Sequence, residues 1–179
     1  MRQLFPLALL LYSGISHATI APQTLTEIKA IQFSEPNIAT AGLPTPAQFV
    51  QLKEAGVDLV INLIPQGNPN GHDNEQALVT EAGMRYEGIE VDWEQPRLED
   101  VTRFFEIMDA HKGQDILIHC VANYRASAFY YLYRSTREGD GEPVSMQQVM
   151  SPWGDLDSSL PQYPQWQQLI EKVTAQSAQ

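Results

Sequence analysis

The chain has 179 residues, of which 22 are acidic and 11 are basic, and its formal net charge at pH 7 is −11. A field of that sign repels the phosphates of nucleic acids and anionic membrane surfaces, which argues against both as partners. An anionic substrate must therefore be held by local donors. Cys120 is the only cysteine, which excludes an internal disulfide.

Residues 1–18 have the pattern of a secretory signal peptide. Arg2 supplies a positive charge, residues 4–12 form an apolar run too short to span a bilayer, and Ala18 ends a small-x-small cleavage site. We therefore expect a periplasmic or secreted protein that begins at Thr19 and has no stable membrane insertion after cleavage. A retained N-terminal anchor is the alternative. Arg2 is the only charged residue in the segment, so cleavage would bring the net charge to −12.

The remaining residues, 19–179, are expected to form a single domain in which strands and helices alternate. Short apolar runs predict strands at 38–41, 57–64, 84–91 and 116–118. Breakers, capping residues and apolar positions at helical spacing predict helices at 46–55, 74–82, 98–111, 127–137, 144–150 and around 166–173. Thr45 and Gln48 form a capping box for the first helix, and Asp73 is the expected cap of the second.

The alternation places the chain in the α/β class. It predicts three α-β-α layers around a mainly parallel central sheet, with ligands bound at the carboxyl ends of the strands. Residues 19–33 have some helical character but little pattern, and 151–164 are expected to be irregular.

Residues 115–127 combine a buried strand, a polar turn and the start of an apolar helix, which is the arrangement that gathers backbone N–H groups around an anion. Cys120 lies in the turn, and Arg125 follows after four intervening residues. A helix N-terminus and a guanidinium both stabilise a thiolate, and a guanidinium also binds two oxygens of a phosphate. Asn123 tolerates the left-handed backbone that the turn requires. Ser127 is expected either to donate to the thiolate or leaving group, or to cap the helix.

The order of segments up to Cys120 resembles that of the dual-specificity protein phosphatases. Residues 86–92, a helix and the strand ending in His119 and Cys120 match the strand, acid-bearing loop, helix and His-Cys…Arg loop of that family. Resemblance to a bacterial phosphatase-like family, also found fused to a β-lactamase-like hydrolase, rests on residues 41–44, Phe49, Leu52, 55–57 and 60–63. Together the similarity covers roughly residues 38–137 and implies a protein-tyrosine-phosphatase-like fold.

The resemblance implies a phosphatase that hydrolyses a phosphomonoester, such as phosphotyrosine, phosphoserine or a small-molecule phosphate, through a phosphocysteine intermediate, with no cofactor and no metal. Cys120 would be the nucleophile, Arg125 the phosphate ligand and Asp92 the general acid. Gapless alignment places Trp93 at the acid position, and Glu94 is the reserve candidate. The other residues that would bind the substrate are Val121, Ala122, Asn123, Tyr124 and Ser127.

The chain departs from the pattern of the dual-specificity family in two ways. Four residues separate Cys120 from Arg125, one fewer than in that family, and Asn123 replaces its usual glycine. His119 would be structural, hydrogen-bonded behind the loop. The shorter loop is shared with rhodanese-like sulfurtransferases, which hold a persulfide sulfur. Three functions are therefore kept: a cysteine-dependent phosphatase, a sulfurtransferase that carries a Cys120 persulfide, and a non-catalytic oxyanion-binding module.

Overall fold

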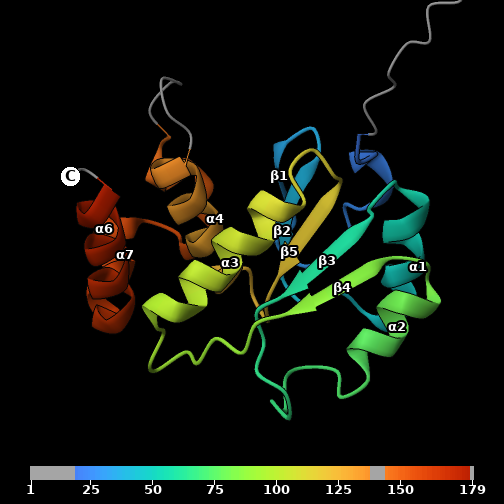
Figure 1. Ribbon diagram of the computed structural model, residues 1–179, viewed down its shortest axis with the longest axis horizontal. Coiled ribbons are helices and arrows are strands. Elements are labelled where there is room, and N and C mark those ends of the chain that lie inside the picture. Colours follow the sequence, from blue (N-terminus) through green and yellow to red (C-terminus); the bar gives the residue numbers. More distant parts are fainter. Residues whose placement is uncertain (1–18, 138–143, 178–179) are drawn as a thin grey trace, which may run out of the picture.

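A computed structural model describes residues 19–137 and 144–177, so the expected signal peptide lies outside the described residues. Five strands form one sheet in the order β1-β2-β5-β3-β4 (Figure 1). Their bounds are Gln32–Glu35 (β1), Ile38–Ala41 (β2), Leu59–Asn62 (β3), Arg85–Gly88 (β4) and Ile116–His119 (β5). The pairs β2–β5, β5–β3 and β3–β4 are parallel, as predicted, whereas β1 pairs antiparallel with β2. This edge strand begins at the end of the segment, residues 19–33, that was expected only to have some helical character.

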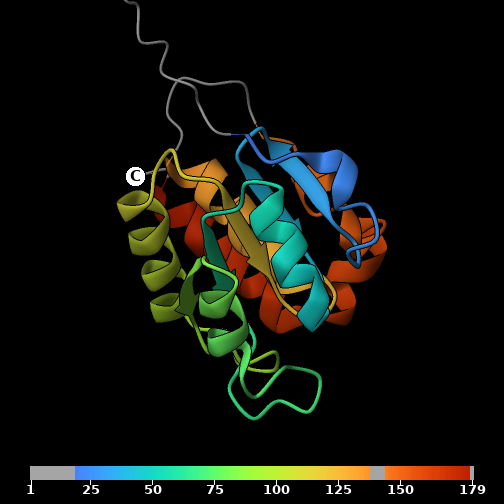
Figure 2. The same ribbon diagram turned by 90° about the vertical axis from the view of Figure 1, so that its right-hand side faces the viewer.

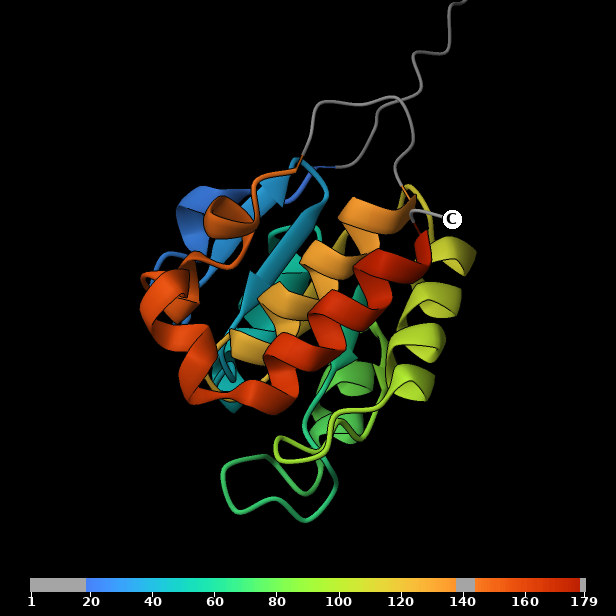
Figure 3. The same ribbon diagram turned by 90° about the vertical axis from the view of Figure 1, so that its left-hand side faces the viewer.

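Helices cover both faces of the sheet. The α-helices are Pro46–Glu54 (α1), Glu75–Glu81 (α2), Leu98–Ala110 (α3), Tyr124–Arg137 (α4), Met146–Val149 (α5), Leu156–Ser159 (α6) and Pro164–Ser177 (α7). Helices α1 and α2 lie on one face (Figure 2), and α3, α4 and α7 lie side by side on the other (Figure 3), which confirms the three layers. Within residues 19–137 and 144–177, none of the helices has the length and apolar composition needed to cross a membrane.

Side chains of the central strands alternate between two hydrophobic cores. Ile116 and Ile118 of β5 point into the core beneath α3, α4 and α7, whereas Leu117 points into the core beneath α1 and α2. All three side chains are fully buried. A parallel strand that is covered on both faces has apolar residues at consecutive positions of its sequence. This strand could therefore be predicted although apolar and polar residues do not alternate in it.

Three local expectations were wrong. Helix α2 begins at Glu75 with Asn74 at the cap position, not Asp73, because the Glu75 amide closes a turn on the His72 carbonyl. Helix α4 begins at Tyr124, three residues before the predicted start. The segment expected to be irregular contains helix α6 and two 3-10 turns, at Ser151–Trp153 (η2) and Leu160–Gln162 (η3). Elements this short have no periodicity for a sequence pattern to reveal.

Candidate active site

Cys120 lies just beyond the end of the middle strand of the sheet. The parallel register places His119 of β5 beside Ala41 of β2 and Asn62 of β3, so three strand ends form one rim. The Cys120 amide donates to the Ala41 carbonyl at 3.2 Å, and the Cys120 side chain is buried. The thiol therefore occupies the edge at which parallel sheets bind their ligands.

Asn123 gives the loop after Cys120 its shape. Its φ is +66°, the left-handed conformation predicted from the sequence. Its side chain is fully buried, and Nδ2 donates to the Ala30 carbonyl at 2.7 Å and to Thr40 Oγ1 at 3.1 Å. The asparagine thus turns the backbone as a glycine would and also ties the loop to β2 and to the segment before β1.

Backbone donors gather at this turn. Apart from an isolated bridge between Gly42 and Ala122, no hydrogen bond joins the amides from Val121 to Arg125 to an acceptor among the described residues. Tyr124 and Arg125 open α4, a helix of 14 residues, and the first amides of a helix have no partner within it. Such a row of amides, together with the positive end of the helix dipole, favours an anion.

Arg125 is a buried cation beside these amides. The residue is 7% exposed, and its Nε is shut off from solvent with no hydrogen-bond partner among the described residues. The guanidinium carbon lies 5.6 Å from the centre of the Trp93 ring, a distance at which cation–π attraction holds the group against the loop that follows β4. The guanidinium is therefore fixed in place with donor capacity left over.

Ser127 takes neither of the two roles considered from the sequence. Its hydroxyl donates to the Asn123 carbonyl at 2.6 Å and approaches the Tyr124 carbonyl at 3.2 Å, so its proton is directed away from Cys120. Because Ser127 lies inside the first turn of α4, it is not the helix cap. In this structure the residue joins the loop to the helix.

The loop between β4 and α3 carries the two candidate acids and Trp93. Oδ1 of the exposed Asp92 accepts hydrogen bonds from the amides of Glu94 at 2.8 Å and Gln95 at 3.3 Å, and Glu94 is also exposed. Trp93 turns inward, and its carbonyl accepts a hydrogen bond from Trp166 Nε1 at 2.9 Å. No hydrogen bond or ion pair between described residues joins either carboxylate to Cys120 or Arg125. Of these three residues, the one that contacts Arg125 is thus Trp93, which gapless alignment places at the acid position.

His119 has a partner that the sequence did not reveal. Its Nε2 lies 2.8 Å from Glu75 Oε1, and the two side chains are 0% and 2% exposed. The pair joins residues 44 positions apart, from the end of β5 to the start of α2. A single glutamate in the first turn of a short helix has no spacing signal that links it to a distant histidine. The contact agrees with the expectation that His119 is hydrogen-bonded behind the loop.

The geometry brings together a thiol, a row of amides and a buried guanidinium at one rim of the sheet. This set suits a tetrahedral oxyanion, with the thiol as nucleophile and the amides and Arg125 as ligands of the charged oxygens. Within the described part of the chain, no group of three or more His, Cys, Asp or Glu side chains is arranged to hold a metal ion.

Comparison with solved structures identifies the fold. Tk-PTP has a TM-score of 0.61 at 14% identity, covering 81% of this chain and 96% of that one. TpbA of Pseudomonas aeruginosa, solved in complex with pTyr, has a TM-score of 0.61 at 16% identity, covering 92% of this chain and 98% of that one. The fold is therefore that of the protein tyrosine phosphatases, as the resemblance predicted.

Closer relatives identify the family, although no protein-family model matches the chain. A phosphatase-like DUF442 protein from Shewanella putrefaciens CN-32 is 47% identical, with a TM-score of 0.78 over 87% of this chain and 96% of that one. The chain belongs to the DUF442 family. It is also 30% identical over 108 residues to a β-lactamase hydrolase-like protein of Xylella fastidiosa, of which it spans only 25% of the length.

Proposed function

We propose that the chain is a cysteine-dependent phosphomonoesterase. The observation that carries the proposal is the buried Arg125 guanidinium with its unpaired Nε, held beside the free amides that follow Cys120. A buried cation is costly unless an anion accompanies it. A phosphoryl group would accept hydrogen bonds from both the guanidinium and the amides. The tyrosine-phosphatase fold and the DUF442 relative support this activity.

Catalysis would proceed in two displacements. The Cys120 thiolate attacks phosphorus, an S–P bond forms, and the P–O bond to the alcohol breaks as a general acid protonates the departing oxygen. A water molecule then attacks the phosphocysteine and loses a proton to the same group. The S–P bond breaks, and inorganic phosphate and the thiolate are released. The amides from Val121 to Arg125 and the Arg125 side chain hold the equatorial oxygens, whose charge is greatest in the transition states.

Asp92 is our candidate for the general acid, and Glu94 is the reserve. Both lie on the loop that also brings Trp93 against Arg125, so they belong to a segment that contacts the proposed phosphate ligand. Asp92 would have to release the amides of Glu94 and Gln95 to turn toward a bound substrate. Asp92→Asn is expected to lower kcat by about 10²–10⁴-fold. Glu94→Gln is the matched variant, and a loss confined to it would move the assignment to Glu94.

The activity can be tested with an aryl phosphate and a chain beginning at Thr19. We choose this substrate because the related fold of TpbA has been solved with pTyr bound. We expect hydrolysis by the parent chain, none by Cys120→Ser, and a large loss in Arg125→Lys, which keeps the charge but not the bidentate fork. Rapid quenching should trap one phosphocysteine per chain at Cys120. Turnover that survives Cys120→Ser would exclude this mechanism.

Sulfur transfer is the second candidate, because only four residues separate Cys120 from Arg125. In that reaction the Cys120 thiolate takes the sulfane sulfur of a donor such as thiosulfate, and sulfite leaves. Cyanide then takes the outer sulfur of the Cys120 persulfide as thiocyanate, which restores the thiolate. Measurement of thiocyanate formation in the same preparations separates the two candidates. Sulfur transfer that depends on Cys120 but not on Asp92, without aryl phosphate hydrolysis, would replace the phosphatase proposal.

A further inference from the structure

A polar cavity opens at the same rim, next to the Cys120 loop. Its volume is about 200 Å³, and it lies between the ends of β3 and β4 and the start of α2. Asn62, at the end of β3, lines it and pairs in register with His119, the residue before Cys120. Neighbouring strands lie about 5 Å apart. The backbone of Asn62, in the wall of the cavity, therefore lies about 5 Å from that of His119, the residue before Cys120.

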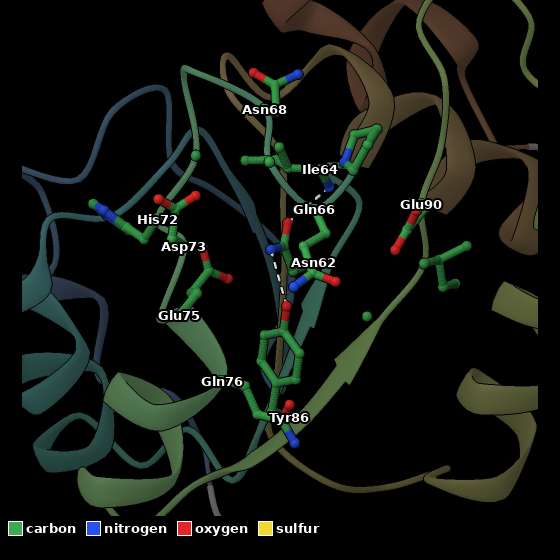
Figure 4. A pocket seen from close by; sticks show the side chains of 15 residues that line it. Asn62, Ile64, Gln66, Asn68, His72, Asp73, Glu75, Gln76, Tyr86 and Glu90 are labelled. Atoms are coloured by element: carbon green, nitrogen blue, oxygen red, sulfur yellow. Dashed lines mark hydrogen bonds between the residues drawn. The ribbon is translucent and has the colours of Figure 1, made fainter.

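The cavity is negatively charged. Asp73, Glu75 and Glu90 line it, and there is no lysine or arginine among the described residues of its wall. The Glu90 carboxylate and the Glu75 carboxylate approach it from opposite sides, with the amide of Asn62 and the hydroxyl of Tyr86 between them (Figure 4). A second phosphate or a carboxylate would be repelled from such a wall.

Glu75 places a buried carboxyl group in the wall of the cavity. The residue is 2% exposed, one carboxylate oxygen is taken by His119, and the other, Oε2, has no hydrogen-bond partner among the described residues. Burial, and to a smaller degree the charges of Glu75 and Glu90, raise the pKa of the Tyr86 hydroxyl, which therefore stays protonated. The Asn62 amide donates to that hydroxyl at 3.1 Å, which fixes the polar floor of the cavity.

From this lining we infer that the cavity is a subsite for a cationic nitrogen carried by the alcohol of the substrate. The inference rests on the proposed function and narrows it to phosphomonoesters of amino alcohols. The phosphoryl group would bind at the amides and Arg125, and the ammonium group would lie among the carboxylates. The net charge of −11 strengthens the argument, because a zwitterionic ester is repelled less than a plain phosphate dianion.

Binding to Cys120→Ser tests the subsite without turnover. O-phosphoethanolamine and propyl phosphate have nearly the same size. The first ends in an ammonium group, and the second has a methyl group at that position. Titration calorimetry at low salt should show that O-phosphoethanolamine binds about five- to tenfold more tightly than propyl phosphate. An ion pair near the protein surface contributes a binding free energy of about that size. Adding Asp73→Asn and Glu90→Gln should bring the ratio below about twofold, with propyl phosphate and inorganic phosphate bound no more weakly than before.

Glu99→Gln is the control, because Glu99 is an exposed carboxylate of α3 that does not line the cavity. It should leave the ratio as in the parent. Equal affinity for the two esters in the parent would overturn the subsite, and an undiminished preference after the double replacement would overturn the assignment of the cation to Asp73 and Glu90. If aryl phosphates are hydrolysed while no cation preference exists, the inference fails and the proposed function stands. If ammonium-dependent binding occurs without hydrolysis of any ester, the subsite stands and the proposed function fails.

Discussion

The Glu75 carboxylate and the His119 imidazole share one buried hydrogen bond behind the Cys120 loop. Glu75→Ala leaves the imidazole buried with neither ring nitrogen bonded, since Nδ1 has no partner among the described residues. Losing the partner of a buried polar group costs about 1–3 kcal/mol, so we expect the free energy of unfolding to fall by that amount. Tm should fall by about 3–10 °C.

The exposed Glu81, at the end of the same helix, supplies the control for that measurement. Glu81→Ala should change the free energy of unfolding by no more than about 0.5 kcal/mol. Equal melting temperatures for Glu75→Ala and Glu81→Ala would show that the buried pair does not stabilise the loop.

Asp115 offers a second prediction, on pH dependence. Burial and the charge of Asp58 raise the pKa of the Asp115 carboxyl, while Lys53 opposes the rise, and Oδ1 has no hydrogen-bond partner among the described residues. When folding raises the pKa of an acidic group, the folded protein becomes less stable as the pH rises through the pKa that the group has in the folded state. Asp115→Asn should therefore raise Tm at pH 7, and the gain should disappear below about pH 4, where both states of the parent are protonated.

A series of melting curves between pH 3 and pH 8 measures this effect. Asp157→Asn, at an exposed position in α6, is the comparison and should show no such pH-dependent gain. A gain for Asp115→Asn that is constant with pH would exclude the ionisation of Asp115 as its cause.

At the scale of elements, the loop between β5 and α4 depends on one left-handed residue. Asn123→Gly keeps that conformation but loses the hydrogen bonds to Ala30 and Thr40, which should cost about 1–3 kcal/mol in the free energy of unfolding. Asn123→Ala loses the same bonds and also carries a Cβ at φ +66°, which adds about 1 kcal/mol. Chemical denaturation of the two variants measures the difference. Equal stability would mean that the loop relaxes to another backbone conformation.

How far the elements could be predicted depends on whether the determining contact is local. The Thr45–Gln48 capping box appears as expected, with Gln48 Oε1 accepting from the Thr45 amide at 2.8 Å, because both partners lie within one turn. The left-handed Asn123 is equally local. Two other contacts depend on the assembled sheet: the hydrogen bond between Glu75 and His119, and the cation–π contact between Arg125 and Trp93. No spacing in the sequence could predict either of them.

At the scale of the whole molecule, the strand order explains why the two proposed sites, one for an anion and one for a cation, open at one edge of the sheet. β5 and β3 are adjacent and parallel, so the Cys120 loop after β5 and the acidic cavity after β3 open at the same edge. The proposal requires that one small zwitterion place its phosphate in the Cys120 loop and its ammonium group in the cavity. Under the proposed function, a chain with a net charge of −11 would recruit a phosphate through local donors.

Export remains a prediction about the whole chain. We propose that residues 1–18 direct it across the inner membrane and are cleaved after Ala18. Expressed in full in a Gram-negative host, the chain should be recovered from the periplasmic fraction with the intact mass of a protein beginning at Thr19. Ala18→Arg should block cleavage and leave the longer chain in the membrane fraction. An uncleaved parent chain in that fraction would instead support the retained anchor.

The Cys120 thiol should stay reduced after export, because its side chain is 1% exposed and has no second cysteine with which to pair.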